Sequence, residues 1–176
     1  MTDEPAMKWV GVSGSTLPIS REVDTDVRRE VTAIVEAGDG VVTGGALGVD
    51  WIAANAALRA DPSGRSVVVI LPTSKEEWLA YHEKSVSLGY LAPKYYEIQR
   101  DLLDALDACG SLEEHPENNL DNGATSWRNA EVVACSDELM AFQVNRSGGT
   151  QQTMNFAKQA GIPVQVFRYR VRSLGL

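Results

Sequence analysis

The sequence predicts an α/β fold: a single Rossmann-like three-layer sandwich with a mostly parallel sheet of about five strands. Short apolar segments alternate with amphipathic segments along the 176 residues, which is the order expected when helices connect parallel strands. One of these segments, Ser66–Leu71, is almost uninterruptedly apolar and β-branched, as strands buried on both faces of a sheet are. Glycine and hydroxyl residues follow several predicted strands directly, where the chain must turn into a helix.

The N-terminal half predicts three strands and two helices. The first strand covers Trp9–Ser13 and ends at Gly14. Valine and isoleucine then recur at helical spacing as far as the stop signal Gly38, and Ser20 is the candidate N-cap. The other elements of this half are a second short buried strand, a helix rich in small residues and a third strand, at 41–43, 49–60 and 66–71.

The C-terminal half predicts four more helices and two more strands. The helices are expected at 74–90, 94–110, 126–136 and 149–161, and the strands at 138–144 and 162–169. Ser111–Thr125 has no periodicity and many turn formers, so a long loop is expected there. No repeat or linker interrupts the order. The prediction is one domain over 1–176, with a helical and loop insertion around 75–122.

Composition restricts the classes of function. The net charge is −8, from 24 acidic and 16 basic residues, which disfavours a surface that tracks a nucleic-acid backbone. A local basic patch remains open, because Arg168, Arg170 and Arg172 would share one face of a strand; a solvated edge is the alternative. Cys109 and Cys135 lie far apart without a CxxC pair, so neither a metal site nor a disulfide framework is expected.

The expected location is cytoplasmic. No apolar run approaches the roughly 20 residues that a membrane span needs, so no membrane partner is expected. The N-terminus lacks the basic and apolar regions of a signal peptide.

Three glycine loops are the candidate functional feature. They read SGST after the first strand, TGGALG after the second and RSGGT after the strand at 138–144. In a parallel sheet these loops meet at the carboxyl edge, where helix N-termini offer unpaired N–H groups to anions. Glycine lets a phosphate approach the backbone, and neighbouring hydroxyls can add hydrogen bonds. A single Gly-Gly turn is weak support, but three together favour a binding edge.

Charged residues beside these loops have two interpretations each. Asp50, just inside its helix, either complements the helix dipole or hydrogen-bonds a sugar hydroxyl or a facing loop. Arg128 opposes the dipole of its helix, which points either to phosphate or carboxylate capture or to a salt bridge with Glu131 or another helix. Trp127 either stacks on a base or packs in the core.

Three segments, VTGGALGVDWIAANAAL, WRNAEVVACSDELMAF and SGGTQQTMNFAKQAGIPVQVF, resemble the SLOG superfamily, and most closely its YspA/YpsA-related branch. The resemblance extends from Trp9 to Phe167 and includes relationships to DNA-processing protein A and to the cytokinin-activating phosphoribohydrolases. It implies a Rossmann-like fold that binds a nucleotide or nucleotide-derived ligand. The residues that would line the pocket are Ser13, Gly14, Gly44, Gly45, Asp50, Arg128, Asn129, Ser147, Gly148, Gly149 and Thr150.

Three functions remain open at this point. The first is a sensor or carrier that binds a small nucleotide-type ligand without turnover, as a homo-oligomer; no cofactor is firmly predicted, and a bound nucleotide or phosphate is the candidate. The second is a nucleotide N-glycosidase or phosphoribohydrolase. Those enzymes carry PGGxGTxxE with a catalytic glutamate, whereas Thr153 stands here, so catalytic residues stay unassigned. The third is a DNA-processing accessory protein, which the charge of −8 disfavours.

Overall fold

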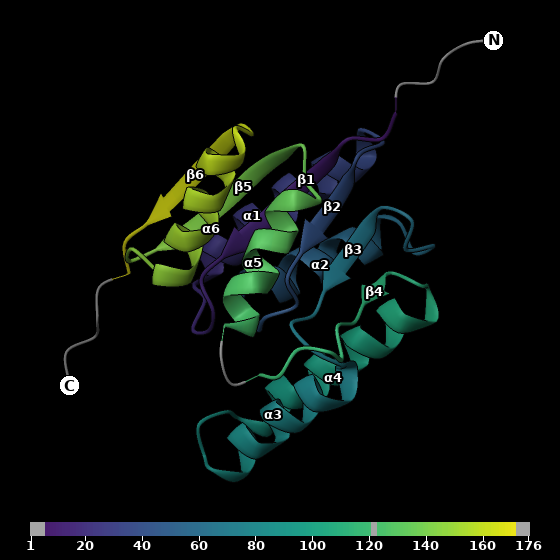
Figure 1. Ribbon diagram of the computed structural model, residues 1–176, viewed down its shortest axis with the longest axis vertical. Helices are drawn as coiled ribbons and strands as arrows, with labels where there is room; N and C mark the ends of the chain where they lie inside the picture. The colour runs from purple at the N-terminus through teal and green to yellow at the C-terminus, as the bar shows by residue number, and fades with distance from the viewer. Residues whose placement is uncertain (1–5, 121–122, 172–176) are drawn as a thin grey trace.

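A computed structural model describes residues 6–120 and 123–171 and contains a six-stranded sheet with helices on both faces (Figure 1). The strand order is β4-β3-β2-β1-β5-β6, and every neighbouring pair is parallel. The α/β fold class is confirmed, with one strand more than expected. The strands are β1 (Trp9–Gly14), β2 (Gly40–Thr43), β3 (Val67–Ile70), β4 (Leu112–Glu113), β5 (Glu138–Val144) and β6 (Val164–Tyr169).

The helices form two layers and a hairpin. In Figure 1, α1 and α2 lie behind the sheet, α5 and α6 lie in front, and α3 and α4 pair beside its β4 end. None of the helices in the described part of the chain is long and apolar enough to cross a membrane. Their bounds are α1 (Arg21–Glu36), α2 (Val49–Ala60), α3 (Lys75–Ser87), α4 (Pro93–Ala108), α5 (Ala124–Ala134) and α6 (Gly148–Ala160).

Helix α1 follows its sequence signals closely. The Ser20 side chain caps its start by accepting a hydrogen bond of 3.3 Å from the Val23 backbone N–H. Val23, Val27 and Val31 recur every four residues and are all fully buried against the core. Past its end, Gly38 has a φ of +89°, a left-handed conformation that glycine adopts without steric cost. Both the predicted cap and the predicted stop are confirmed.

The core lies on both faces of the central strands. Val10, Val12 and Val41 are buried in the cluster beneath α1 and α2, and small alanines of α2 let these two helices approach each other closely. On the other face, Leu139 and Ala141 pack against α6. Burial on both faces explains why these strands read as continuous apolar runs rather than as an alternating pattern.

The predicted loop at 111–125 is partly wrong. It contains β4, the sixth strand, whose two residues pair with Val69 and Ile70, and α5 already begins at Ala124. A strand of two residues cannot display a period, and α5 has no capping side chain at Gly123, so neither start has a sequence signal. Positions 121–122 of this predicted loop, and Arg172, lie outside the described residues.

His115 holds the segment after β4 in place through contacts with two glutamates and a tryptophan. Its Nδ1 lies 2.9 Å from Glu117 and its Nε2 lies 2.8 Å from Glu113, while its ring packs edge-on against Trp127 with centroids 4.5 Å apart. A neutral imidazole has only one N–H, so both contacts are hydrogen bonds only when the ring is protonated. Burial lowers the pKa of His115, but the two carboxylates outweigh this effect, and its pKa is raised overall.

The contacts of His115 with Glu113 and Glu117 should make the free energy of unfolding depend on pH. Because the pKa is raised in the folded state, the stabilisation is fully present below about pH 6.5 and is lost as pH rises through the folded pKa. We expect the stability advantage over His115→Gln, measured by urea unfolding, to be largest near pH 6 and to shrink toward alkaline pH. Glu117→Gln should weaken the same dependence. A stability advantage that stays constant with pH would contradict a protonated His115 that donates to both carboxylates.

Candidate ligand-binding site at the carboxyl edge of the sheet

The strand order reverses between β1 and β5. From β1 the chain adds β2, β3 and β4 on one side and then returns to place β5 and β6 on the other. The loops that follow β1 and β5 therefore diverge, and ligands of open α/β sheets bind in the crevice between such loops. Ser15 joins them here, because its Oγ accepts a hydrogen bond of 3.0 Å from the Val144 N–H and its own N–H donates to Phe142 O at 3.2 Å.

A hollow of about 480 Å³ opens at this crevice, and we call it the switch-point cleft. Its volume is within the range of roughly 300–1,000 Å³ that is typical of small-molecule sites. Hydroxyl, amide and apolar side chains all line it, so it offers hydrogen bonds and apolar contact together. The lining residues are Ser15, Thr16, Pro18, Ile19, Ser20, Val144, Asn145, Ser147 and Val171.

The N-terminus of α6 lies next to the switch-point cleft. Ser147 is the N-cap residue and lines the cleft, yet no side chain caps the helix. Gly148 and Gly149 follow and are exposed, and a methyl group placed on either would have no atom within 4 Å. The first N–H groups of a helix have no partner inside it, so this end carries free donors and the positive end of the dipole.

The loop before α6 is held in an uncommon conformation. Asn145 and Arg146 have φ values of +48° and +60°, which non-glycine residues rarely adopt. Asn145 is fixed by two hydrogen bonds to Val171, one donated by its Nδ2 and one accepted by its Oδ1, each 3.0 Å long. Backbone strain that the surroundings maintain in this way often marks functional loops. The loop therefore presents the α6 N-terminus in a fixed direction.

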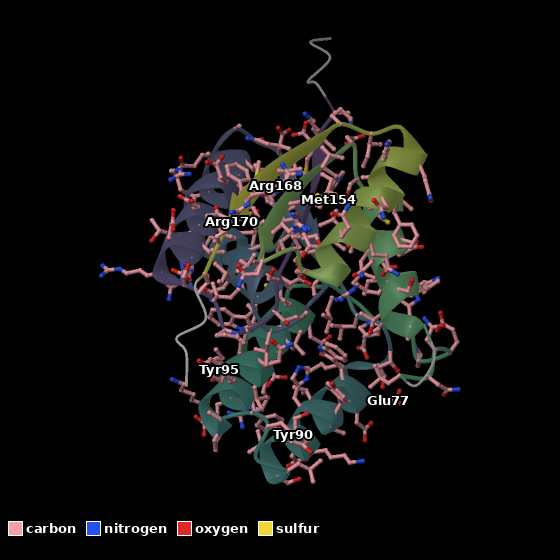
Figure 2. The ribbon with its side chains drawn as sticks, turned by 90° about the vertical axis from the view of Figure 1, so that its left-hand side faces the viewer. Glu77, Tyr90, Tyr95, Met154, Arg168 and Arg170 are labelled. Atoms are coloured by element: carbon pink, nitrogen blue, oxygen red, sulfur yellow. The ribbon has the colours of Figure 1, made fainter. Side chains whose placement is uncertain are left out.

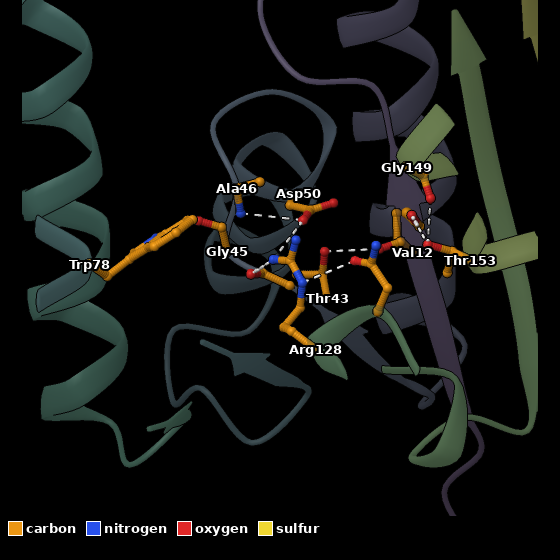
Figure 3. Close-up of polar contacts among 12 residues, drawn as sticks. Val12, Thr43, Gly45, Ala46, Asp50, Trp78, Arg128, Gly149 and Thr153 are labelled. Atoms are coloured by element: carbon orange, nitrogen blue, oxygen red, sulfur yellow. Dashed lines mark hydrogen bonds and ion pairs between the residues drawn. The ribbon is translucent and has the colours of Figure 1, made fainter. Parts of the chain in front are cut away.

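The glycine loop after β2 is filled from within the protein (Figure 3). The Arg128 guanidinium lies against Gly44 and donates a hydrogen bond to its carbonyl, so a side chain at position 44 would collide with it. The Gly45 carbonyl accepts hydrogen bonds from Trp78 Nε1 at 3.2 Å and Gln99 Nε2 at 2.7 Å. Internal partners thus account for the absence of side chains in this loop.

Gly14 at the end of β1 also has an internal explanation. A methyl group placed on Gly14 would lie 2.5 Å from Val49, the first residue of α2. This close approach lets α2 pack tightly over β1. The glycine permits helix packing, and Gly14 is absent from the lining of the switch-point cleft.

Arg128 and Asp50 form a buried ion pair. They are 4% and 6% exposed, and Arg128 Nη1 lies 3.5 Å from Asp50 Oδ2, which also accepts a 3.3 Å hydrogen bond from the Ala46 N–H. Burial raises the pKa of the Asp50 carboxyl, and the guanidinium opposes that rise. Burial likewise lowers the pKa of Arg128, against the opposing effect of Asp50. Each charge compensates the other, and Glu131 is not the partner of Arg128.

The remaining predicted site residues extend this buried network. Asn129 Oδ1 accepts a hydrogen bond from Arg128 Nε at 3.1 Å, and its Nδ2 donates to Gln152 at 3.2 Å. Ser13 Oγ donates to Thr153 Oγ1 at 3.3 Å, and Thr153 donates to the Gly149 carbonyl at 3.0 Å. Position 153, where the phosphoribohydrolases have glutamate, therefore holds a buried hydroxyl that is bonded within α6.

The predicted site residues thus divide into two groups. The first group makes internal contacts below the edge of the sheet, and four of its members line a space of negligible volume. Its members are Ser13, Gly14, Gly44, Gly45, Asp50, Arg128 and Asn129. The second group stands at the α6 N-terminus, where Thr150 adds a buried hydroxyl that donates to Ser147 at 3.2 Å; its members are Ser147, Gly148, Gly149 and Thr150. Trp127 lies against His115 and away from both groups.

Sequence reasoning missed several residues of the switch-point cleft. Ser15 and Thr16 belong to the SGST loop, and the position of their hydroxyls directly after a strand is the signal that could identify them. Ile19 and Val171 carry no chemical signal and enter the cleft only through the course of their loops. A topology that places β1 beside β5 is needed to find them.

A second hollow, the arginine groove, lies beside the cleft. It measures about 960 Å³ and is lined by Arg146, Arg168 and Arg170 together with neutral residues, with no acidic side chain among the described lining residues. Figure 2 shows Arg168 and Arg170 on the same side of the molecule. The basic patch is therefore real for these two arginines, and Arg146 joins it from the β5–α6 loop.

The model of the family DNA recombination-mediator protein A matches residues 6–175. The chain belongs to this family. The expected membership of the SLOG superfamily is thereby confirmed. No curated protein sequence matches the chain.

Solved structures agree with this family at the level of the fold. DNA processing protein A of Helicobacter pylori, described in its single-stranded DNA binding mode, has a TM-score of 0.64 at 20% identity over 94% of this chain and 67% of that one. The molybdenum cofactor binding protein of Rippkaea orientalis has a TM-score of 0.64 at 18% identity, covering 94% and 79%. DNA processing protein A of Streptococcus pneumoniae reaches 0.62 at 20% identity, covering 96% of this chain and only 52% of its own.

These relatives bear on the expected partners. Two of the three are DNA processing proteins, so the sequence-based expectation against nucleic acid finds no support in the comparisons. Identities this low show a shared fold, which leaves the ligand of this chain to be argued from its own site.

The buried ion pair generates a direct test. Arg128→Met should lower the free energy of unfolding by about 3–5 kcal/mol, because the buried Asp50 carboxyl would lose its cationic partner and would have to take up a proton well above its ordinary pKa or stay charged at a desolvation cost. Adding Asp50→Asn should recover part of the loss. Urea titration measures both values, with the exposed Arg59→Met as control, which should change stability by less than about 0.5 kcal/mol. A loss of under about 1 kcal/mol for Arg128→Met would contradict a stabilising role.

Proposed function

We propose that this protein binds a phosphorylated ligand of the nucleotide type, with the phosphate at the N-terminus of α6 and the adjoining part of the ligand in the switch-point cleft. One observation carries the proposal. Among the predicted loop glycines, Gly148 and Gly149 leave open space where a side chain would stand, whereas Gly14, Gly44 and Gly45 face side chains of the protein itself. Open backbone at a helix N-terminus is a common anion site.

The electrostatics favour a dianion at this position. Unpaired amides of the first turn of α6 would donate to phosphate oxygens, and the helix dipole adds about 0.3–1 kcal/mol or more to the attraction. The hydroxyl of Ser147, which accepts from Thr150, is the nearest side-chain group at the cap. Arg146, two residues before Gly148, adds a positive charge in the same loop. The ligand would thus be held mainly by backbone donors that need no rearrangement.

The buried network supports this site indirectly. Thr153 hydrogen-bonds the Gly149 carbonyl and Ser13, which ties the first turn of α6 to β1. Asn129 reaches α6 through Gln152. In this proposal Arg128, Asn129 and Asp50 are positioning residues for the carboxyl edge. The ligand contacts come from Ser147, Gly148 and Gly149, and the buried Thr150 holds the Ser147 hydroxyl.

Single-stranded nucleic acid is the second candidate ligand. The arginine groove favours it, because Arg146, Arg168 and Arg170 could follow a phosphodiester backbone that leaves the α6 N-terminus. Membership of the DNA recombination-mediator protein A family and the Helicobacter pylori relative support the same candidate. A mononucleotide does not need the arginine groove, whereas a strand would need it.

Gly148→Val tests the phosphate site. The variant should fold like the wild type, because a side chain there meets nothing within 4 Å. It should bind nucleoside monophosphates about tenfold more weakly or worse, because blocking one amide–phosphate hydrogen bond removes about 1.5–3 kcal/mol. Thermal shift measures binding, since ligand at 100 times its dissociation constant adds about 2.7 kcal/mol of stability.

Two checks complete this experiment. Ala80→Val places the same side chain on an exposed position of α3 and should leave affinity unchanged. Unaltered binding by folded Gly148→Val would exclude α6 as the phosphate site. Chromatography of the incubated samples should return intact nucleotide; a released base would instead establish the phosphoribohydrolase alternative.

The two candidate ligands differ in their dependence on the arginines. If a strand binds, Arg168→Gln/Arg170→Gln should lower the slope of log affinity against log salt by about 1.4, because each phosphate contact on a single strand contributes about 0.7. Fluorescence anisotropy with a labelled oligothymidylate measures this slope, and Arg59→Gln/Arg65→Gln is the exposed control pair. Unchanged slopes, with mononucleotide binding intact, would favour the small ligand alone.

A further inference from the structure

A third hollow adjoins the switch-point cleft on the side of α2 and α4. It measures about 360 Å³, and we call it the apolar groove. Its walls come from four separate parts of the fold, namely the loop after β1, the loop after β2, the first turns of α2 and the start of α4. The residues that form these walls are Leu17, Leu47, Trp51, Ile52, Tyr95 and Ile98.

The apolar groove and the switch-point cleft share the residues Ile19 and Ser20. The loop that carries them is fixed, because the Leu17 N–H donates to the Leu47 carbonyl at 3.2 Å and the Val49 N–H donates to the Ser15 carbonyl at 3.1 Å. A ligand anchored at α6 would therefore meet the apolar groove on crossing Ser20. The two hollows are consecutive compartments along the same carboxyl edge of the sheet.

Aromatic side chains give the apolar groove its chemistry. Trp51 and Tyr95 are half-buried, so each presents part of its ring to solvent. The indole orientation is fixed by a hydrogen bond of 3.2 Å from its Nε1 to the Ile98 carbonyl. Lys94 Nζ lies 5.0 Å from the centroid of the Tyr95 ring. Aromatic walls held in place are suited to a flat, weakly polar ring.

The rim of the apolar groove is polar where its walls are not. Arg21 and Asp24, from the first turn of α1, line its edge. Asp24 already accepts from Arg28 Nε at 3.1 Å, so this carboxylate is held in place beside the opening. A guanidinium and a carboxylate beside the opening can hydrogen-bond the exocyclic groups of a base. An aliphatic ligand has no such groups to bond.

We propose that the apolar groove holds the base of a nucleoside 5′-monophosphate whose phosphate lies at α6. The inference rests on the proposed function and extends it, because it assigns the base of the nucleotide to the apolar groove, a compartment separate from the switch-point cleft. The phosphate supplies the anchor, the switch-point cleft takes the sugar, and Trp51 with Tyr95 contacts the base.

Binding of ribose 5-phosphate and of the four common nucleoside 5′-monophosphates, measured by isothermal titration calorimetry, tests the inference. The best monophosphate should bind the wild type at least about tenfold more tightly than ribose 5-phosphate, because stacking of one base on an aromatic ring is worth about that factor. Tyr95→Ala should remove most of this preference and leave ribose 5-phosphate binding unchanged. Tyr95→Phe, which keeps the ring, should retain the preference.

Tyr90→Ala is the matched control. Tyr90 is 82% exposed in the turn between α3 and α4, outside the apolar groove, so its loss should change neither affinity (Figure 2). Equal affinity of ribose 5-phosphate and every monophosphate, or unaltered monophosphate affinity in Tyr95→Ala, would overturn the inference while the phosphate site stands. If neither ribose 5-phosphate nor any monophosphate binds the wild type, the proposed function itself fails.

Discussion

The structure of the carboxyl edge depends on the buried contacts of Arg128 with Asp50 and with the Gly44 carbonyl. Arg128 belongs to α5, on one face of the sheet, and Asp50 to α2, on the other, so the pair joins the two helical layers across the end of β2. The next carbonyl, Gly45, receives donors from α3 and α4. Four helices thus meet at the short loop between β2 and α2, and a polar group lost there would leave others unpaired.

This constraint decides which glycine loop can serve a ligand. The loop after β2 has the residue types of a phosphate cradle, but its Gly44 and Gly45 carbonyls accept hydrogen bonds from protein side chains and its Ala46 N–H donates to Asp50. The loop after β5 has the opposite character, since Gly148 and Gly149 begin a helix that no side chain caps. The same glycine-rich composition therefore serves internal packing after β2, whereas after β5 it leaves backbone donors open to a ligand.

Particular residues show which parts of the fold can be predicted from the sequence and which cannot. Ser20, Gly38 and Gly161 predict helix ends correctly, because caps are local and their backbone geometry depends on few neighbours. Strand β4 escapes prediction because it exists only by pairing with Val69 and Ile70, far away along the chain. The pairing of Arg128 with Asp50 escapes for the same reason: two residues 78 positions apart, each on its own helix, leave no periodic trace. Residue types locate candidate loops, and topology decides what faces them.

Net charge is a poor guide to the partners of such a surface. The chain carries −8 overall, yet interactions between exposed charges fade over about 8–10 Å at physiological salt, so a bound phosphate responds mainly to its own neighbourhood. Around the arginine groove that neighbourhood contains Arg146, Arg168 and Arg170 and no acidic lining residue among those described. The acidic residues pair elsewhere, for example Asp26 with Arg29 and Asp104 with Lys75. An acidic protein can therefore present a basic carboxyl edge, and the average over the whole chain conceals it.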